Sequence, residues 1–195
     1  MTQTIAIIDY GAGNVQSVKN ALSRLGYQAV ITSNADTIRQ AEKVIFPGVG
    51  HAQAAMKNLK ATGLDTLIPT LKQPVLGICL GMQLMCGFCE EGATQGLGIF
   101  DVEVKKFDTS VKIPQIGWNR IENLKSDLFK NIKENEFMYL VHSYYVPLND
   151  SCIAKTSYGE KYASALHKDN FYGVQFHPEK SSKAGALVLQ NFLNL

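Results

Sequence analysis

Residues 74–85 read PVLGICLGMQLM, and an apolar run passes here directly into a stretch of helical character. The residues before Cys79 predict a buried β-strand, and the residues after it predict a helix. Gly77 and Gly81 lie two residues to either side of the cysteine. A strand followed at once by a helix is the repeating unit of a parallel sheet covered by helices. The stretch therefore predicts an α/β fold.

The residues that precede this stretch repeat the same alternation. Strands are predicted over 4–10, 28–33, 43–48 and 74–78, and helices over 15–26, 36–42, 51–63 and 64–72. Gly26 ends the first of these helical patterns and is predicted to be its C′ residue. Strands that alternate with helices at this spacing indicate a flavodoxin-like, mostly parallel central sheet with helices on both faces.

The second half of the chain has a different pattern. Strand candidates follow one another over 98–107, 116–123, 136–146, 152–158, 162–168 and 171–176, and an amphipathic helix is predicted over 184–195. The turn at Asp169 and Asn170 predicts a hairpin between the last two strands. We expect one domain over residues 1–195, with antiparallel strands added in its second half.

Composition and charge exclude several classes of function. The chain has 195 residues, 46% of them hydrophobic, and its 19 basic and 17 acidic residues give no basic face that would favour nucleic acid. The longest uncharged run, 73–89, is broken by glycines and is short for a bilayer span, so we interpret it as core. The N-terminal stretch MTQTIAIIDYG lacks the basic segment of a signal peptide. We expect it to begin the first strand of a cytoplasmic protein.

The four cysteines are 79, 86, 89 and 152, and a reducing compartment is the natural expectation for them. CGFC, residues 86–89, has the spacing of a redox or zinc half-site, but no second pair exists. We expect this tract to lie inside or at the end of a helix and to supply two small core residues. The glycine-rich stretch at 9–17 has Gln16 where a dinucleotide site needs a third glycine. No metal or cofactor is predicted.

The residues from Gly77 to Gly81 have the G-x-Nuc-x-G spacing of a nucleophile on a tight strand-to-helix turn. Such a turn forces an unfavourable backbone conformation, and glycines two residues away remove the clash. The turn would also place the Cys79 sulfur at a helix N-terminus and aim the Leu80 N–H at a developing oxyanion. The pattern by itself leaves two interpretations open, a structural cysteine and a nucleophile.

A thiolate needs a base and a group that orients the base. Pro178 favours extended geometry at His177, and residues i and i+2 of an extended segment face the same side. Glu179 is therefore predicted to lie beside the His177 ring. By itself this could be a strand-end histidine with a solvated glutamate, but a nearby reactive cysteine favours catalysis. FPGVGH, residues 46–51, is either a simple turn or a loop that presents a backbone N–H to a ligand.

At this point the sequence resembles a known family. Cys79 within GICLGMQ and His177 within GVQFHPE resemble the signature of the class I glutamine amidotransferases. The resemblance extends over nearly the whole chain, and it is strongest to members that serve histidine biosynthesis. The matching stretches, in order, are IIDYGAGNVQSVKNAL, FPGVGHAQAAM, GICLGMQLM, IGWNR, VHSYYV and GVQFHPEKS.

The resemblance implies hydrolysis of L-glutamine through a γ-glutamyl thioester on Cys79. His177 would act as general base and acid, and Glu179 would orient it. The remaining site residues implied by the resemblance are Leu80, Val49 and Gly50 for the oxyanion hole, and Gly48, Gln83, Glu91, Ser143 and Tyr144 for glutamine binding.

The resemblance also implies a partner. In these family members ammonia passes to a (β/α)₈-barrel cyclase subunit of a heterodimer, which forms imidazole glycerol phosphate and an aminoimidazole carboxamide ribonucleotide. Asn14, Trp118 and Lys180 match interface positions, although a lone Trp is more often a core or half-buried residue and a Lys a solvated charge. Two alternatives stay open. One is a glutaminase subunit for another acceptor, and the other is a non-catalytic flavodoxin-like scaffold in which Cys79 is structural.

Overall fold

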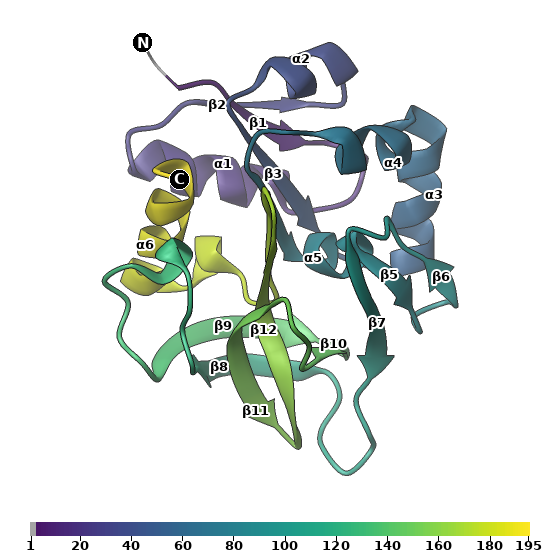
Figure 1. Cartoon of the computed structure of the whole chain (residues 1–195), viewed down its shortest axis with the longest axis vertical. Coiled ribbons are helices and arrows are strands. Elements are labelled where there is room, and N and C mark those ends of the chain that lie inside the picture. The colour runs from purple at the N-terminus through teal and green to yellow at the C-terminus, as the bar shows by residue number, and fades with distance from the viewer. Residues whose placement is uncertain (1–2) are drawn as a thin grey trace.

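The computed structural model describes residues 3–195 and is drawn in Figure 1. Met1 and Thr2, with which the expected first-strand stretch begins, lie outside the described residues. The strands are β1 (Ile5–Ile8), β2 (Ala29–Thr32), β3 (Lys43–Gly48), β4 (Val75–Cys79), β5 (Cys86–Cys89), β6 (Thr94–Gln95), β7 (Phe100–Lys106), β8 (Gln115–Ile121), β9 (Glu136–His142), β10 (Tyr144–Pro147), β11 (Cys152–Tyr158), β12 (Glu160–Lys168) and β13 (Phe171–Val174). The α-helices are α1 (Val15–Arg24), α2 (Ala35–Gln40), α3 (Ala52–Thr62), α4 (Leu64–Leu67), α5 (Leu80–Met85) and α6 (Ser182–Leu193), and the 3₁₀ turns are η1 (Ile68–Thr70), η2 (Asp127–Phe129) and η3 (Pro178–Lys180).

The main sheet has a parallel core in the order β2-β1-β3-β4-β13. This is the strand order of flavodoxin-like folds, and it confirms the predicted fold class. Beyond β13 the sheet continues through β12, β10, β7, β5 and β6, with β11 paired to β12. Most of these added strands are antiparallel, as the second half of the sequence predicts, although β5 and β7 run parallel. β8 and β9 form a separate antiparallel ribbon.

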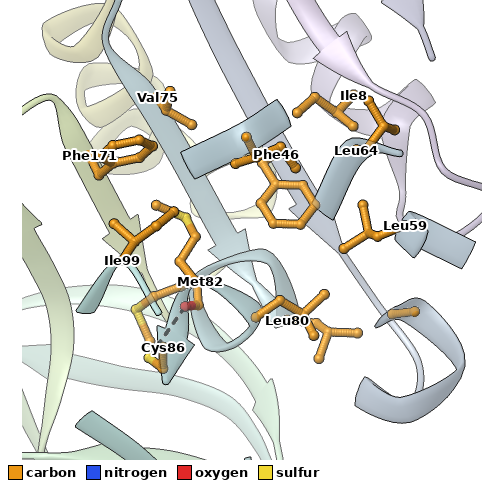
Figure 2. Close-up of a cluster of buried hydrophobic side chains, with 14 of the residues drawn as sticks. Ile8, Phe46, Leu59, Leu64, Val75, Leu80, Met82, Cys86, Ile99 and Phe171 are labelled. Atoms are coloured by element: carbon orange, nitrogen blue, oxygen red, sulfur yellow. Dashed lines mark hydrogen bonds between the residues drawn. The ribbon is translucent and has the colours of Figure 1, made fainter. Parts of the chain in front are cut away.

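Helices cover both faces of the parallel core because successive strand residues point to opposite sides. Ile7 and Ile45 belong to the buried cluster that also contains residues of α1 and α6. Ile8 and Phe46 belong to the opposite cluster, with residues of α3, α4 and α5. Figure 1 shows α1 and α6 on one side of the sheet and α3 and α4 on the other. Figure 2 shows how Leu80 and Met82 of α5 reach into the second cluster.

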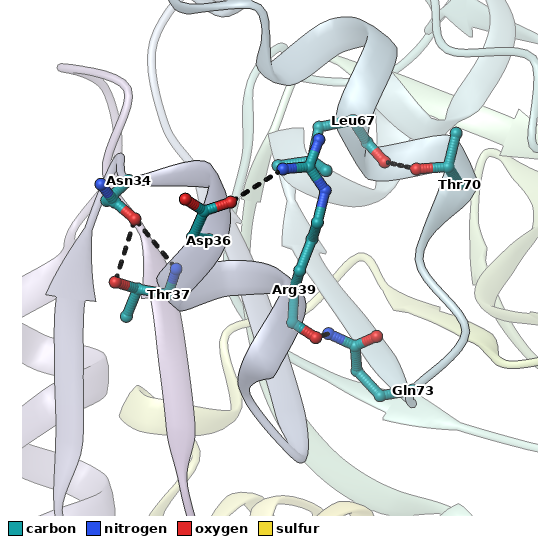
Figure 3. Close-up of polar contacts among 7 residues, drawn as sticks. All are labelled: Asn34, Asp36, Thr37, Arg39, Leu67, Thr70 and Gln73. Atoms are coloured by element: carbon teal, nitrogen blue, oxygen red, sulfur yellow. Dashed lines mark hydrogen bonds and ion pairs between the residues drawn. The ribbon is translucent and has the colours of Figure 1, made fainter.

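Local signals in the sequence fix the ends of the helices. The Asn34 side chain caps α2 by accepting hydrogen bonds from the N–H of Thr37 at 2.9 Å and its hydroxyl at 3.1 Å (Figure 3). The Asp36–Arg39 pair on the same helix is largely exposed and adds little to stability. Gly26 follows α1 with a φ of 87° and donates its N–H to Ser23, which confirms it as the C′ residue.

The structure corrects two details of the sequence interpretation. CGFC is not helical: α5 ends at Met85, and residues 86–89 form β5, which pairs with β7 and β6. Strand pairing overrides the helical pattern here, and Gly87 is a poor helix former. The expected strand over 136–146 is also broken at Ser143 into β9 and β10, which pair with different strands. In the part of the chain that the structure describes, no helix has the length and apolar character needed to cross a bilayer.

Candidate active site

The candidate site lies at the carboxyl ends of three neighbouring parallel strands, the usual ligand position in open α/β sheets. β3 ends at Gly48, which pairs in register with Cys79 at the end of β4. On the other side of β4, Val174 at the end of β13 pairs with Ile78. The chain segments that leave β3, β4 and β13 therefore emerge side by side. These segments carry the PGVG loop, Cys79 and His177.

Cys79 has the strained backbone that its flanking glycines predict. Its φ is 53° and its ψ is −112°, a conformation that residues with a Cβ rarely adopt. A Cβ on Gly81 would overlap the carbonyl oxygen of Phe46, and one on Gly77 would lie 2.9 Å from the Met82 nitrogen. The turn therefore requires glycine at both positions. The Cys79 residue is 7% exposed, and its Sγ lies 3.7 Å from the Val141 carbonyl oxygen.

His177 and Glu179 form the buried pair that the sequence predicts, although the segment is extended only at His177. Glu179 lies in the 3₁₀ turn η3, which corrects the expected extended geometry. The His177 Nδ1 atom lies 2.9 Å from Glu179 Oε1, and the two side chains are 5% and 1% exposed. The second carboxylate oxygen of Glu179 is buried and makes no hydrogen bond in the structure. A buried carboxylate is stabilised by a cation beside it, so this geometry favours a protonated His177.

The protonation of His177 is set by opposing effects. Burial lowers its pKa, whereas hydrogen bonds with Cys79 and Glu179 and the negative charges of both partners raise it. The net effect raises the pKa of His177 to about 10. His177 therefore holds a proton at neutral pH, and it lines the same cavity as the candidate nucleophile. A proton at this position can be delivered to a departing amine.

The backbone of His177 is attached to the neighbouring ribbon. Its N–H donates to the Tyr139 carbonyl oxygen at 2.9 Å, and the Ser181 hydroxyl donates to the His177 carbonyl oxygen at 2.6 Å. The Tyr139 N–H in turn donates to the Ser181 hydroxyl oxygen at 2.9 Å. These bonds connect the segment that bears His177 to β9, so the ribbon holds the His177 backbone in place.

A cavity of about 320 Å³ opens beside the Cys79 sulfur. Its lining includes most of the residues that the sequence singles out and three that it does not. The lining residues are Val49, Gly50, Cys79, Leu80, Gln83, Glu91, Pro114, Val141, His142, Ser143, Tyr144, His177 and Lys180. A volume of this size accommodates a small polar metabolite.

Two cavity residues have polar contacts that fix their orientation. Glu91 Oε2 accepts a hydrogen bond from the Ala52 N–H at 2.7 Å, at the start of α3. The Gln83 Nε2 atom donates to the Tyr144 carbonyl oxygen at 2.9 Å. The carboxylate of Glu91 and the amide of Gln83 thus come from different elements but lie on the same cavity.

The remaining sequence candidates do not line the cavity. Gly48 packs against the start of α5, where a Cβ would lie 2.6 Å from the Gly81 nitrogen, and Glu179 contacts Nδ1 of His177. Asn14 precedes α1 and makes no side-chain cap. Trp118 is 51% exposed on β8, so it is not a core residue, and the alternative of a half-buried aromatic remains.

Sequence reasoning missed two buried polar residues beside the site. Gln175 is 0% exposed and its Nε2 atom lies 3.6 Å from Cys79 Sγ. The alternation that placed Glu179 beside His177 could also have placed Gln175 there. His142 Nδ1 lies 2.8 Å from the Tyr144 carbonyl oxygen, which can only accept, so we assign the proton to Nδ1. Burial lowers the pKa of His142 to about 4, so this imidazole is neutral at pH 7.

Other features of the described residues offer less chemistry. A larger open groove of about 810 Å³ lies along residues 3–6 and 26–30, and it is lined by no cysteine, histidine or carboxylate. Cys86 and Cys89 are buried free thiols, and burial raises the pKa of both. Within residues 3–195 no group of three histidine, cysteine or acidic side chains is arranged to hold a metal ion.

Comparison with known proteins assigns the chain to a family. The model of the family described as glutamine amidotransferase class-I matches residues 6–195. The chain therefore belongs to the class I glutamine amidotransferases. It is 56% identical over 194 residues to the imidazole glycerol phosphate synthase subunit HisH of Bacteroides fragilis strain YCH46, covering 98% of this chain and 99% of that protein. The HisH subunit of Haemophilus influenzae strain Rd is 49% identical, with 97% and 96% covered. The chain belongs with these HisH subunits.

Solved structures agree with the fold. A crystal structure of a glutamine amidotransferase superimposes with a TM-score of 0.77 at 16% identity, covering 97% of both chains. A chain of PurLQS from Thermotoga maritima gives a TM-score of 0.74 at 18% identity, covering 100% of this chain and 99% of that one. At these identities the likeness concerns the fold alone.

Proposed function

We propose that this chain is the glutaminase subunit of an imidazole glycerol phosphate synthase and that Cys79, His177 and Glu179 are its catalytic triad. The observation that carries the proposal is the buried, hydrogen-bonded pair of His177 and Glu179, with His177 and Cys79 lining one cavity at the ends of β3, β4 and β13. The choice of this synthase is supported by relatives at 56% and 49% identity, which are named as its HisH subunit.

In the first half of the reaction, the Cys79 thiolate attacks the side-chain carbonyl carbon of glutamine. The C–N bond breaks, and the His177 imidazolium gives its proton to the departing nitrogen, which leaves as ammonia. The product on the enzyme is a γ-glutamyl thioester. Glu179 keeps the imidazole ring in place and stabilises its charge, because its carboxylate lies against Nδ1.

In the second half, the now neutral His177 takes a proton from water, and the resulting hydroxide attacks the thioester carbon. The C–S bond breaks, glutamate leaves, and the thiolate–imidazolium pair is restored. Charge develops on the former carbonyl oxygen in both halves. The Leu80 N–H and an N–H of the Val49–Gly50 segment are the donors we assign to that oxygen, and both segments line the cavity.

The same cavity supplies groups that would bind the rest of glutamine. Glu91 provides a negative charge for the α-ammonium group of the substrate. Gln83, Ser143 and Tyr144 provide neutral polar groups. Gly48 does not line the cavity, and it stays a glutamine-binding candidate by resemblance only. We place this reaction in the cytoplasm, where a catalytic thiol stays reduced.

A (β/α)₈-barrel cyclase subunit is the partner that would receive the ammonia. The surface that supports this assignment is the outer face of the β8–β9 ribbon, where Ile116, Trp118 and Phe137 are 63%, 51% and 44% exposed. Exposed apolar side chains grouped in this way are typical of an interaction surface. Val141 on the same ribbon and Lys180 line the cavity, so this face leads to the cavity mouth. Asn14 is a further interface candidate by resemblance only.

The test is glutamate release by the purified chain, measured alone, with the cyclase subunit, and with the cyclase subunit plus its acceptor ligand. We expect release that depends on the partner, and Cys79→Ala should abolish it. Cys79→Ala should leave partner binding and synthesis from added ammonia intact, because the sulfur acts only on glutamine. Loss of both activities would contradict the division of roles between the subunits.

Two further arms separate the alternatives. A glutamine-like alkylating agent should label Cys79 in the assembled complex, and absence of labelling would favour a scaffold protein with a structural cysteine. Stimulation by a barrel subunit from another amination pathway, but not by the cyclase, would favour a different acceptor.

A further inference from the structure

Gln175 is in direct contact with the reacting sulfur, although it does not line the cavity. It is the first residue after β13, and the register of Val174 with Ile78 brings it next to Cys79. Its Nε2 atom donates to Cys79 Sγ at 3.6 Å, and the residue is 0% exposed. The sulfur thus has a buried amide N–H as a neighbour in addition to the cavity that it shares with His177.

Gln175 also controls a second side chain of the site. The Gln83 Nε2 atom donates to Gln175 Oε1 at 2.9 Å and to the Tyr144 carbonyl oxygen at 2.9 Å. A primary amide has two N–H groups, and both of those on Gln83 are used. The amide plane of Gln83 is therefore fixed, and its carbonyl oxygen is the group left for a ligand in the cavity.

From these contacts we propose that Gln175 is a positioning residue for glutamine hydrolysis, holding the Cys79 sulfur with its N–H and the Gln83 amide with its carbonyl oxygen. The inference rests on the proposed function and deepens it. One amide performs both tasks because it has a donor and an acceptor on a single rigid plane. A methionine has nearly the same shape but can make neither bond, and it leaves a buried donor of Gln83 without a partner.

Gln175→Met, assayed in complex with the cyclase subunit and its acceptor ligand, should separate the two tasks. Loss of the N–H beside the sulfur should lower kcat, and release of Gln83 should raise KM for glutamine. We expect kcat/KM to fall about tenfold or more, the size of effect that follows from losing a hydrogen bond to a charged group. The rate of iodoacetamide reaction at Cys79, followed by peptide mass spectrometry, should reach its half-maximum at a higher pH than in the unmodified protein.

Two control variants make the result specific. Gln83→Met removes the bonds from Gln83 to Gln175 and to the Tyr144 carbonyl oxygen but keeps the Gln175 N–H on the sulfur. It should therefore raise KM and leave the pH profile of alkylation in place. In the double variant Gln83→Met/Gln175→Met, the two increases in KM should not add. The shift in the pH of half-maximal alkylation should be as large as in Gln175→Met alone. Asn191→Leu removes another buried amide, on α6, where it donates to the carbonyls of Leu128 and Lys130. It should reduce thermal stability without moving the alkylation profile.

A measurement on the unmodified protein guards against a variant that does not fold. With glutamine side chains labelled with ¹⁵N, alkylation of Cys79 should shift the Gln175 amide resonance. It should leave that of Gln73 unchanged, because Gln73 precedes β4, whose other end carries Cys79, and donates to the Ile38 carbonyl oxygen. An unchanged Gln175 resonance, or a Gln175→Met variant with normal kcat and an unmoved alkylation profile, would overturn the proposal. If the unmodified complex released no glutamate, the proposed function would fail, while the alkylation profile would still decide the role of Gln175.

Discussion

The Glu91 carboxylate accepts a hydrogen bond from the Ala52 N–H at 2.7 Å, and this single contact joins two parts of the site. Ala52 begins α3 directly after the PGVGH loop, whereas Glu91 follows β5 and lines the cavity. The residue proposed to bind the substrate ammonium therefore also fixes the end of the loop proposed to stabilise the oxyanion.

We expect Glu91→Gln to raise KM for glutamine about tenfold or more with a smaller change in kcat. The amide keeps an oxygen for the Ala52 N–H but loses the charge that would pair with the substrate ammonium. Steady-state glutamate release by the complex measures both constants. Glu91→Ala should also lower kcat, because the loop loses its attachment. Equal effects of the two variants on kcat would argue against a role of this contact in the loop.

Gly81→Ala should destabilise the fold by about 3 kcal/mol, because the added methyl group overlaps the Phe46 carbonyl oxygen and the backbone must move. Urea unfolding followed by circular dichroism measures the loss. The matched control is Gly87→Ala, whose Cβ would lie 3.7 Å from its nearest neighbour, the Val102 carbonyl oxygen. The turn at Cys79 would be less constrained than we describe if both variants unfolded at the same urea concentration.

The two histidines of the site should act on stability in separate pH ranges. The pKa of His142 is lowered to about 4, so the unfolded chain binds more protons than the folded chain between pH 6.5 and 4. Stability should fall by about 3 kcal/mol across that range as the pH decreases. The pKa of His177 is raised to about 10, so its stabilisation is full below pH 6.5 and is lost as the pH rises through 10.

Denaturant unfolding at a series of pH values measures both ranges, and NMR titration of the imidazole resonances assigns them. His142→Gln should remove the loss of stability between pH 6.5 and 4 and leave the loss near pH 10 unchanged. Cys79→Ala should lower the pKa of His177, because it removes one of the two groups that hold the proton. A His177 resonance that titrates near pH 6.5 in the unmodified protein would contradict the buried pair.

Trp118→Ala should weaken binding of the cyclase subunit by about 2 kcal/mol and leave the melting temperature of the isolated chain nearly unchanged. An aromatic residue 51% exposed on a ribbon adds little to the core but is typical of residues that dominate interfaces. Calorimetric titration measures the affinity. Val30→Ala, at a position 56% exposed on β2 far along the sheet, is the matched control and should have no effect on binding. Equal losses of affinity in both variants would show that the β8–β9 ribbon is not the interface.

Local sequence predicted the elements that depend on local physics. The glycines around Cys79 predicted a strained turn, because only glycine leaves room for the backbone at Phe46 and Met82. The contact between His177 and Glu179 was predicted, but the extended geometry assumed for it was wrong beyond His177. Glu179 lies in the 3₁₀ turn η3, which still brings its carboxylate against the imidazole. CGFC begins at the end of α5, one of the two expected positions, but its strand was not predicted. Strand pairing with β7 is a contact between segments that a local pattern does not contain.

The sequence by itself determined the α/β fold, the turn at Cys79 and the chemical types of the groups available for glutamine hydrolysis. These follow from side-chain periodicity and backbone sterics within a few residues. Only the tertiary structure decided which groups meet. The parallel register of β3, β4 and β13 brings Gln175 to the sulfur. Burial lowers the pKa of His142, whereas Cys79 and Glu179 raise the pKa of His177 against the effect of its burial. Both depend on neighbours distant in the chain, because desolvation and charge are properties of the packed site.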